Sequence, residues 1–222
     1  MVDVGANFGY YPILFGLLSD GQCEAIALEP DPVNAAWLER NLALNPSLRI
    51  AIVKAAAGDH DGGSVSFELS KQNHNLWSGV GGIASAGNEH ANGNVYVPTV
   101  TVDAELDRRG VAEIPLTLID VEGYEAKVIE GMSAGIARRR YRNVVVEYHS
   151  WAIADPVLGI REIVARFENA GYTGLRFQPH GDEATDKSRD YYRLDVSKAA
   201  PRPISYSGLT KWEHFLFSVE SK

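Results

Sequence analysis

The chain has 222 residues, of which 45% are hydrophobic, and its formal net charge is -8. This length is sufficient for one α/β domain with a sizeable core, so the sequence predicts a single domain over residues 1–222. The negative charge argues against nucleic acids and anionic membranes as partners, and the absence of a long apolar run or signal peptide favours a cytoplasmic protein.

The chain begins with a short apolar strand that runs into a glycine-rich turn. Two valines flank Asp3, Gly5 permits a tight turn, and Gly9 lets the next helix begin close to a ligand. Only four residues precede the turn, whereas a strand in an open sheet normally has about five or six. We therefore expect either that the strand continues upstream of Met1 or that it is short and frayed.

A second apolar run, residues 23–28, ends in Glu29, 20 residues after Gly9. An acid at the tip of the second strand typically binds a ribose diol. The turn lacks the further glycine of a dinucleotide fingerprint, and Asp3 would repel phosphate but attract an ammonium group. These features favour S-adenosylmethionine, a nucleoside cofactor with a charged amino-acid tail and no phosphates. The alternative is that the turn merely joins a strand to a helix.

Strand-like and helix-like segments alternate along the chain, which predicts a doubly wound parallel sheet. Asp31 is expected to cap a second helix that has Pro32 in its first turn and stops at Asn45. Cys23 lies in the apolar run and is interpreted as a core residue. Helices are also expected at residues 10–19, 124–132 and 159–170, and strands at 48–55, 116–121, 144–148, 172–177 and 214–219.

Residues 64–69 and 94–102 both alternate apolar and polar side chains, which predicts an antiparallel hairpin at the edge of the sheet. The long polar segment between them, residues 70–93, is expected to help choose the substrate. A second long insert, at about residues 178–211, is given the same role. A surface loop without function is the alternative for both.

Two pairs of polar residues follow later strands. Asp120 and Glu122 are two residues apart at a strand end, where they could hold the ammonium group, orient a substrate or accept a proton. One of them could instead cap the next helix. Glu147 and His149 follow three valines, and His149 beside a carboxylate is the best candidate base. A purely structural hydrogen-bonded pair is the alternative.

The motifs DVGANFG (3–9), LEPD (28–31), AAGD (56–59), VTVD (100–103), IDVEG (119–123) and VVEYH (145–149) occur in this order. In this respect the chain resembles FkbM-type methyltransferases, most clearly over a core of residues 1–150. Residues 151–222 would add a helix and strands. The resemblance implies a class I Rossmann-like sheet, mostly parallel with an antiparallel last strand, and S-adenosylmethionine as the cofactor.

The resemblance also implies roles for individual residues. It implies that Glu29 holds the ribose, that Ala57 touches the adenine, and that Asp120 faces the methionine end or the transferred methyl group. The remaining cofactor residues are Asp3, Gly5, Ala6, Asn7, Phe8, Gly9, Tyr10 and Pro30. The catalytic candidates are His149, Glu147 and Glu122.

The expected reaction is methylation of a hydroxyl group on a sugar, glycan, lipid or natural product. No repeated metal-ligand spacing is present, so no metal is expected. Two alternatives stay open: a cofactor-binding module without catalysis, and a nicotinamide-dependent oxidoreductase, which the missing glycine disfavours.

Overall fold

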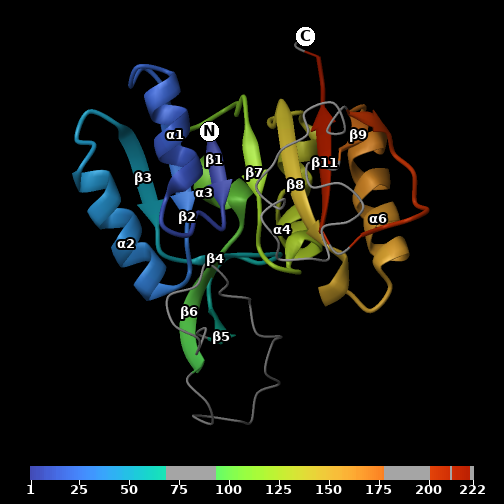
Figure 1. Cartoon of the computed structure of the whole chain (residues 1–222), viewed down its shortest axis with the longest axis horizontal. Helices are drawn as coiled ribbons and strands as arrows, with labels where there is room; N and C mark the ends of the chain where they lie inside the picture. The colour runs from blue at the N-terminus through green and yellow to red at the C-terminus, as the bar shows by residue number, and fades with distance from the viewer. Residues whose placement is uncertain (69–93, 178–200, 211, 221–222) are drawn as a thin grey trace, which may run out of the picture.

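The computed structural model describes residues 1–68, 94–177, 201–210 and 212–220. Within these residues an eight-stranded sheet has the order β10-β9-β11-β8-β7-β1-β2-β3 (Figure 1). Its strands are β1 (Val2–Val4), β2 (Glu24–Leu28), β3 (Arg49–Val53), β7 (Thr117–Ile119), β8 (Asn143–His149), β9 (Thr173–Phe177), β10 (Arg202–Pro203) and β11 (Trp212–Ser218). The helices are α1 (Tyr10–Leu18), α2 (Pro32–Ala43), α3 (Val102–Arg108), α4 (Glu125–Gly131), α5 (Ser133–Ala137) and α6 (Pro156–Asn169), with a 3-10 turn η1 (Ser150–Ala152).

The sheet is parallel from β3 to β8, and the strands beyond β8 pair antiparallel with their neighbours. Strand β1 pairs in parallel with both β2 and β7, and β7 pairs in parallel with β8. Strand β11 lies antiparallel between β8 and β9. The predicted class, a mostly parallel sheet with an antiparallel last strand, is therefore confirmed.

Alternation along the strands divides the apolar side chains between two layers. Val2 and Val4 of β1 pack with residues of α3, α4, α5 and α6 in the largest core cluster. Ala27 of β2 points to the other face, where it packs with Leu38 of α2. Helices therefore cover both faces of the sheet, as expected for a doubly wound fold.

Helix α2 starts as its sequence predicts. The Asp31 carboxylate accepts hydrogen bonds from the backbone N–H groups of Val33 (2.7 Å) and Asn34 (3.3 Å), and Pro32 occupies the first turn. Proline is tolerated there because its missing N–H has no helical partner in any case. The cap fixes where α2 begins relative to the end of β2.

The predicted antiparallel pair forms, but it does not extend the main sheet. Strands β5 (Ser64–Glu68) and β6 (Asn94–Val100) pair antiparallel, and β6 also pairs in parallel with β4 (Ala56–Ala57). These three strands make a separate sheet that projects from the edge where the parallel strands end (Figure 1). Because β4 follows β3 almost directly, the chain leaves the main sheet before the hairpin begins.

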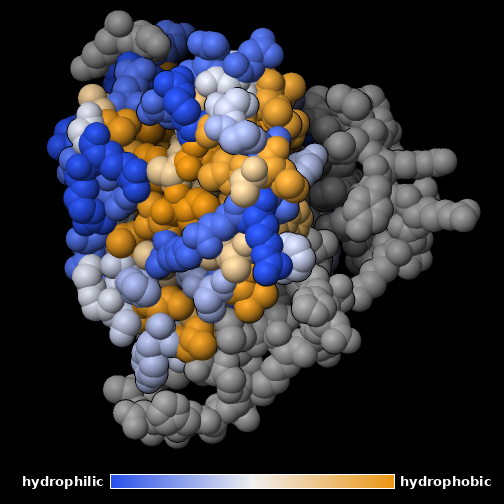
Figure 2. All heavy atoms as spheres, turned by 90° about the vertical axis from the view of Figure 1, so that its left-hand side faces the viewer, coloured by the Kyte–Doolittle hydropathy of each residue, from blue (hydrophilic) through white to orange (hydrophobic). Residues whose placement is uncertain are grey.

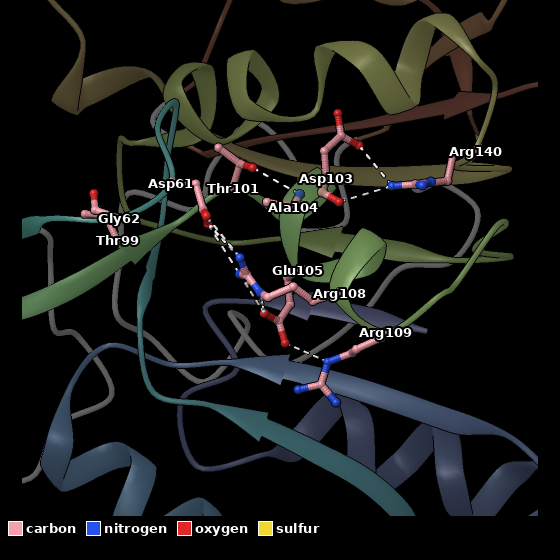
Figure 3. Close-up of polar contacts among 10 residues, drawn as sticks. All are labelled: Asp61, Gly62, Thr99, Thr101, Asp103, Ala104, Glu105, Arg108, Arg109 and Arg140. Carbon is pink, nitrogen blue, oxygen red and sulfur yellow. Dashed lines mark hydrogen bonds and ion pairs between the residues drawn. The ribbon is translucent and has the colours of Figure 1, made fainter.

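Helix α3 was not predicted, because the apolar alternation of β6 runs into it. The Oγ1 atom of Thr101 accepts the N–H of Ala104 at 3.1 Å and caps the helix (Figure 3). Glu105 and Asp61 both accept hydrogen bonds from the Arg108 guanidinium. The contact with Asp61 attaches α3 to the segment that precedes β5.

Two further expectations differ from the structure or fall outside it. Cys23 is exposed, which corrects its assignment to the core, because β2 begins only at Glu24. Residues 70–93, and residues 178–200 and 211 of the second insert, lie outside the described residues. None of the described helices has both the length and the apolar character needed to span a bilayer.

The outer surface of α1 and α2 is partly apolar. Figure 2 shows hydrophobic residues gathered among hydrophilic ones on this side of the molecule. The exposed apolar residues of the two helices are Tyr10, Tyr11, Leu14, Leu17, Leu18, Val33 and Trp37. Tyr10 and Tyr11, at the start of α1, also reach the candidate site.

Candidate functional site

Strands β2, β1, β7 and β8 are neighbours, and their carboxyl ends meet at one edge of the sheet. Open parallel sheets bind ligands at this edge. A cavity of about 230 Å³ opens there, lined by Gly5, Asn7, Phe8, Tyr10, Tyr11, Glu29, Pro30, Phe67, Asp120, Val121 and Glu122. The edge therefore brings together most of the predicted cofactor residues.

Three lining residues were not predicted. Tyr11 and Val121 are sequence neighbours of predicted residues, so their position next to the site was available from the sequence. Phe67 belongs to β5, in the small sheet, and only the tertiary structure brings it to the cavity.

The glycine turn is tightly packed against the end of β7. Gly5 has a φ of +89°, and a Cβ atom at this position would overlap the backbone carbonyl of Asp120. Gly9 has a φ of +91°, and a Cβ atom there would overlap the side chain of Leu38. Both positions therefore require glycine for conformation and for space.

Glu29 holds this turn in place. Its Oε2 atom accepts the backbone N–H of Asn7 at 2.7 Å, and its Oε1 atom accepts the backbone N–H of Asp31 at 2.8 Å. Burial raises the pKa of Glu29 to about 7, although these hydrogen bonds act in the opposite direction. Each carboxylate oxygen has a second lone pair, so Glu29 can also accept a ligand hydroxyl.

Asp3 lies in the middle of β1, with 1% of its surface exposed. Neither of its carboxylate oxygens has a hydrogen-bond partner among the described residues. Burial, followed by the charge of Glu29, raises the pKa of Asp3 to about 7. A buried acid without a partner is costly, and a cationic ligand group or a bridging water would satisfy it.

Four predicted cofactor residues do not line the cavity: Asp3, Ala6, Gly9 and Ala57. Ala6 is buried against Ala27 and Leu38. Ala57 is buried in β4 and packs in the largest core cluster. For Ala57, contact with an adenine ring stays a prediction.

A second group of side chains surrounds the His149 ring at the end of β8. His149 is buried, and its Nε2 atom lies 3.2 Å from Glu122 Oε2, 3.8 Å from Asp120 Oδ1 and 3.9 Å from Glu147 Oε1. Its Nδ1 atom lies 2.7 Å from Oε1 of Glu125, a fully buried residue at the start of α4. Glu125 was not predicted, although the sequence shows it as a third acid after Asp120 and Glu122.

The carboxylates determine the charge of this group. Burial lowers the pKa of His149, but the hydrogen bond and charge of Glu125, with Glu122 and Asp120, outweigh burial and raise that pKa to about 9. Burial and then the charge of Glu147 raise the pKa of Asp120 to about 8. At neutral pH the imidazole is therefore protonated, and Asp120 retains a proton more readily than an ordinary aspartate.

Glu147 and His149 lie two residues apart on β8, and the 3.9 Å between Oε1 and Nε2 is too long for a hydrogen bond between them, so the alternative of a hydrogen-bonded pair is wrong. Glu147 Oε2 lies 3.3 Å from Nε2 of His214, which is its register partner on β11. Directly opposed residues on neighbouring strands are closer than residues two apart on one strand. The partner of each side chain is therefore set by the packing of α4 and β11.

Glu122 reaches His149 because the chain turns sharply after β7. Glu122 has a φ of +52° and Gly123 a φ of +105°. The left-handed conformation is unfavourable for glutamate and often marks a functional position. Helix α4 has no side-chain cap at its start, so Glu122 does not act as the helix cap.

The same group offers atoms that bind cations. Donor atoms of Asp120, Glu122 and His149 lie within 4.8 Å of one another, a spacing at which an ion could bridge them. The expectation that no metal takes part stays a prediction.

The comparisons with known proteins point to one family. The model of the methyltransferase FkbM domain matches residues 3–173. A search of curated proteins finds no match to this chain.

Solved structures also match the chain, and one of them, with a TM-score above 0.5, shares its fold. The methyltransferase FkbM from Methylobacillus flagellatus KT has 15% identity and a TM-score of 0.57, and the match covers 99% of this chain and 43% of that one. A precorrin-6y C5,15-methyltransferase from Geobacter metallireducens GS-15 has 12% identity and a TM-score of 0.46, with 100% and 79% covered. The N-terminal domain of human METTL16, in complex with SAH, has 12% identity and a TM-score of 0.44, with 98% and 59% covered. The chain thus spans less than half the length of the Methylobacillus protein.

Proposed function

Because the chain belongs to the FkbM methyltransferase family, we propose that it transfers a methyl group from S-adenosylmethionine to a hydroxyl group. We propose a small-molecule or glycan acceptor such as a sugar, a lipid or a natural product. Strands from both ends of the chain join one sheet, which supports a single domain.

This proposal rests on the position of two groups of residues, the glycine turn and the acids around His149, which touch each other. The turn held by Glu29 and the acids around His149 meet where the backbone of Gly5 packs against Asp120. A cofactor on the turn and an acceptor at His149 would therefore be neighbours. This adjacency is what a group transfer requires.

The residues present fit the cofactor. Asp3 is a buried acid without a described partner, and it suits the ammonium group of the methionine part, directly or through a water molecule. Glu29 can accept ribose hydroxyls while it keeps its two backbone hydrogen bonds. Tyr10, Phe8 and Pro30 would contribute apolar walls.

The bound cofactor would supply a methyl group already activated by its sulfonium. The protein has then to hold the acceptor oxygen roughly 3 to 3.5 Å from that carbon and to remove its proton. Glu122 and Asp120 would orient the acceptor. Glu147, or His149 in the neutral form that prevails above its pKa of about 9, would take the hydroxyl proton.

Isothermal titration calorimetry tests the first half of the proposal. S-adenosylmethionine and S-adenosylhomocysteine should bind the full chain, whereas nicotinamide dinucleotides should not, since the turn has no pyrophosphate-binding glycine. Gly5→Ala should abolish the heat of binding. If the correctly folded chain binds neither adenosyl compound, the proposed function is wrong.

Methyl transfer tests the second half. The chain is incubated with methyl-labelled cofactor and a panel of glycans and hydroxylated natural products, with His149→Gln as the matched inactive variant. Label in a hydroxyl-bearing product supports the enzyme. Tight cofactor binding without transfer to any acceptor class would support the non-catalytic module instead.

A further inference from the structure

Glu125 has no role in the function proposed so far, yet it contacts two parts of the acceptor side. It is the first residue of α4, and none of its surface is exposed. Its Oε1 atom lies 2.7 Å from Nδ1 of His149 and accepts the backbone N–H of Gly123 at 2.9 Å. One carboxylate oxygen thus contacts both the end of β8 and the loop after β7.

The first contact fixes the histidine. A carboxylate accepts hydrogen bonds and does not donate them, so Nδ1 of His149 must carry the proton of this bond. Nε2 is then the ring atom that exchanges a proton, and it faces Glu122, Asp120 and Glu147. The ring is held in one orientation, and its neutral form in one tautomer.

The second contact fixes the loop. Gly123 and Glu122 both have positive φ angles, and a Cβ atom on Gly123 would overlap Ala152 of η1. By accepting the Gly123 N–H, Glu125 holds the turn that directs Glu122 toward Nε2 of His149. The 3.2 Å distance between Glu122 and His149 therefore depends on both contacts of Glu125, the one with the His149 ring and the one with the Gly123 N–H.

The environment of Glu125 is unfavourable for a residue that serves packing alone. No lysine or arginine in the described ranges pairs with it, and its Oε2 atom has no hydrogen-bond partner there. An apolar residue would fill the same space without the cost of burying a charge. Val128 and Ile129 already anchor α4 in the core.

We propose that Glu125 is a positioning residue for methyl transfer: it holds His149 in the Nδ1-protonated tautomer, with Nε2 directed at the acceptor oxygen, and it sets Glu122 beside it. This inference rests on the proposed function. The groups that face the ring are Asp120, Glu122, Glu125 and Glu147, and His214 of β11 faces Glu147 from the other side. Of the four acids, only Glu125 contacts Nδ1.

The test compares Glu125→Gln and Glu125→Asp with Glu130→Gln, an exposed residue of the same helix. Long-range 1H–15N spectra report the tautomer and the titration midpoint of His149, whose signals are assigned by their loss in His149→Gln. Circular dichroism and S-adenosylhomocysteine affinity report whether the fold is kept. None of these measurements requires a known acceptor.

In the unsubstituted chain, Nδ1 should carry the proton of the neutral ring. Glu125→Gln should lower the midpoint by about one pH unit or more, because a charge in direct contact is lost. Glu125→Asp, whose shorter side chain cannot keep the 2.7 Å contact, should lower it by less. Glu130→Gln should leave both tautomer and midpoint unchanged.

Once an acceptor is identified, Glu125→Gln should lower kcat at least tenfold with less than a threefold change in KM. The inference is overturned by an unchanged midpoint and tautomer in a folded Glu125→Gln variant, or by an equal effect in Glu130→Gln. If Glu125→Gln does not fold, Glu125→Asp decides by the same criteria. Failure of S-adenosylhomocysteine to bind any variant, including the unsubstituted chain, would instead count against the proposed function.

Discussion

The carboxylate of Glu29, at the end of β2, accepts the backbone N–H of Asn7, which lies in the turn after β1. Its other oxygen accepts the N–H of Asp31, the residue that caps α2. One buried acid thus joins the turn, the end of the second strand and the start of the second helix. In the proposed enzyme the same acid would bind the cofactor ribose, so shape and recognition depend on one side chain.

Replacement of Glu29 by alanine should lower both the stability of the fold and the affinity for the cofactor. The N–H groups of Asn7 and Asp31 would lose their acceptor, which costs about 1–3 kcal/mol of unfolding free energy for each group that stays buried and unpaired. S-adenosylhomocysteine affinity should fall at least tenfold. Urea denaturation and calorimetry measure the two effects. Glu39→Ala, which removes an exposed acid paired with Lys54, is the control and should change neither by much.

Cofactor affinity should depend on pH through the acid in β1. The pKa of Asp3 is about 7 in the free protein, well above its ordinary value of 3.8, so Asp3 is largely protonated below pH 7. An ammonium group pairs only with the ionised acid. Affinity for S-adenosylhomocysteine should therefore rise between about pH 5.5 and 7.5, by up to tenfold per unit, with release of a proton. Asp3→Asn should bind weakly with a flatter profile, and an unchanged profile in that variant would contradict the assignment.

Asp3 and Glu29 together make the stability of the free protein depend on pH. The folded-state pKa values of Asp3 and Glu29, both about 7, lie above their ordinary values of 3.8 and 4.5. The folded state therefore binds more protons than the unfolded state between about pH 4 and 7. Their contribution to the unfolding free energy is full below about pH 4 and declines as the pH rises from about 4 to 7. Denaturation across this range should show a smaller decline in Asp3→Asn than in the unsubstituted chain.

Substitutions at two glycines with similar backbone conformation distinguish the effect of limited space from the effect of backbone strain. Gly5 and Gly62 have similar φ angles, +89° and +85°, but only Gly5 has atoms in the way of a Cβ atom. Gly62→Ala should cost about 1 kcal/mol from backbone strain alone. Gly5→Ala should cost clearly more and abolish cofactor binding, because the backbone of Asp120 would have to move. Equal losses in the two variants would show that strain, not space, requires Gly5.

Removal of the proposed base should lower turnover and leave cofactor binding in place. His149→Gln is expected to reduce kcat by about 10²–10⁴-fold, the usual contribution of a positioned acid or base. His60→Gln, at an exposed histidine paired with Asp59, is the matched control. Full turnover in both His149→Gln and Glu147→Gln would exclude these two residues as the base.

Much of the cofactor side could be predicted because it depends on local rules. Gly5 and Gly9 mark the turn by residue type, and Glu29 and Asp120 follow directly after apolar strand segments. In a parallel sheet, strand ends meet at one edge whatever the details of packing. The helix starting at Pro32 was also predictable, since its cap and first turn are neighbours in sequence.

The sequence by itself determined the order of elements, the turn and the acids at the strand ends, because strand and helix periodicity and the conformational freedom of glycine act within a few residues. The tertiary structure alone decided the pairing of those acids. Glu125 contacts His149 because α4 packs beneath β8, and Glu147 faces His214 because β11 inserts antiparallel between β8 and β9. The tertiary structure also placed the hairpin in a sheet of its own. Contacts between residues far apart in the chain depend on register and packing, which no local pattern specifies.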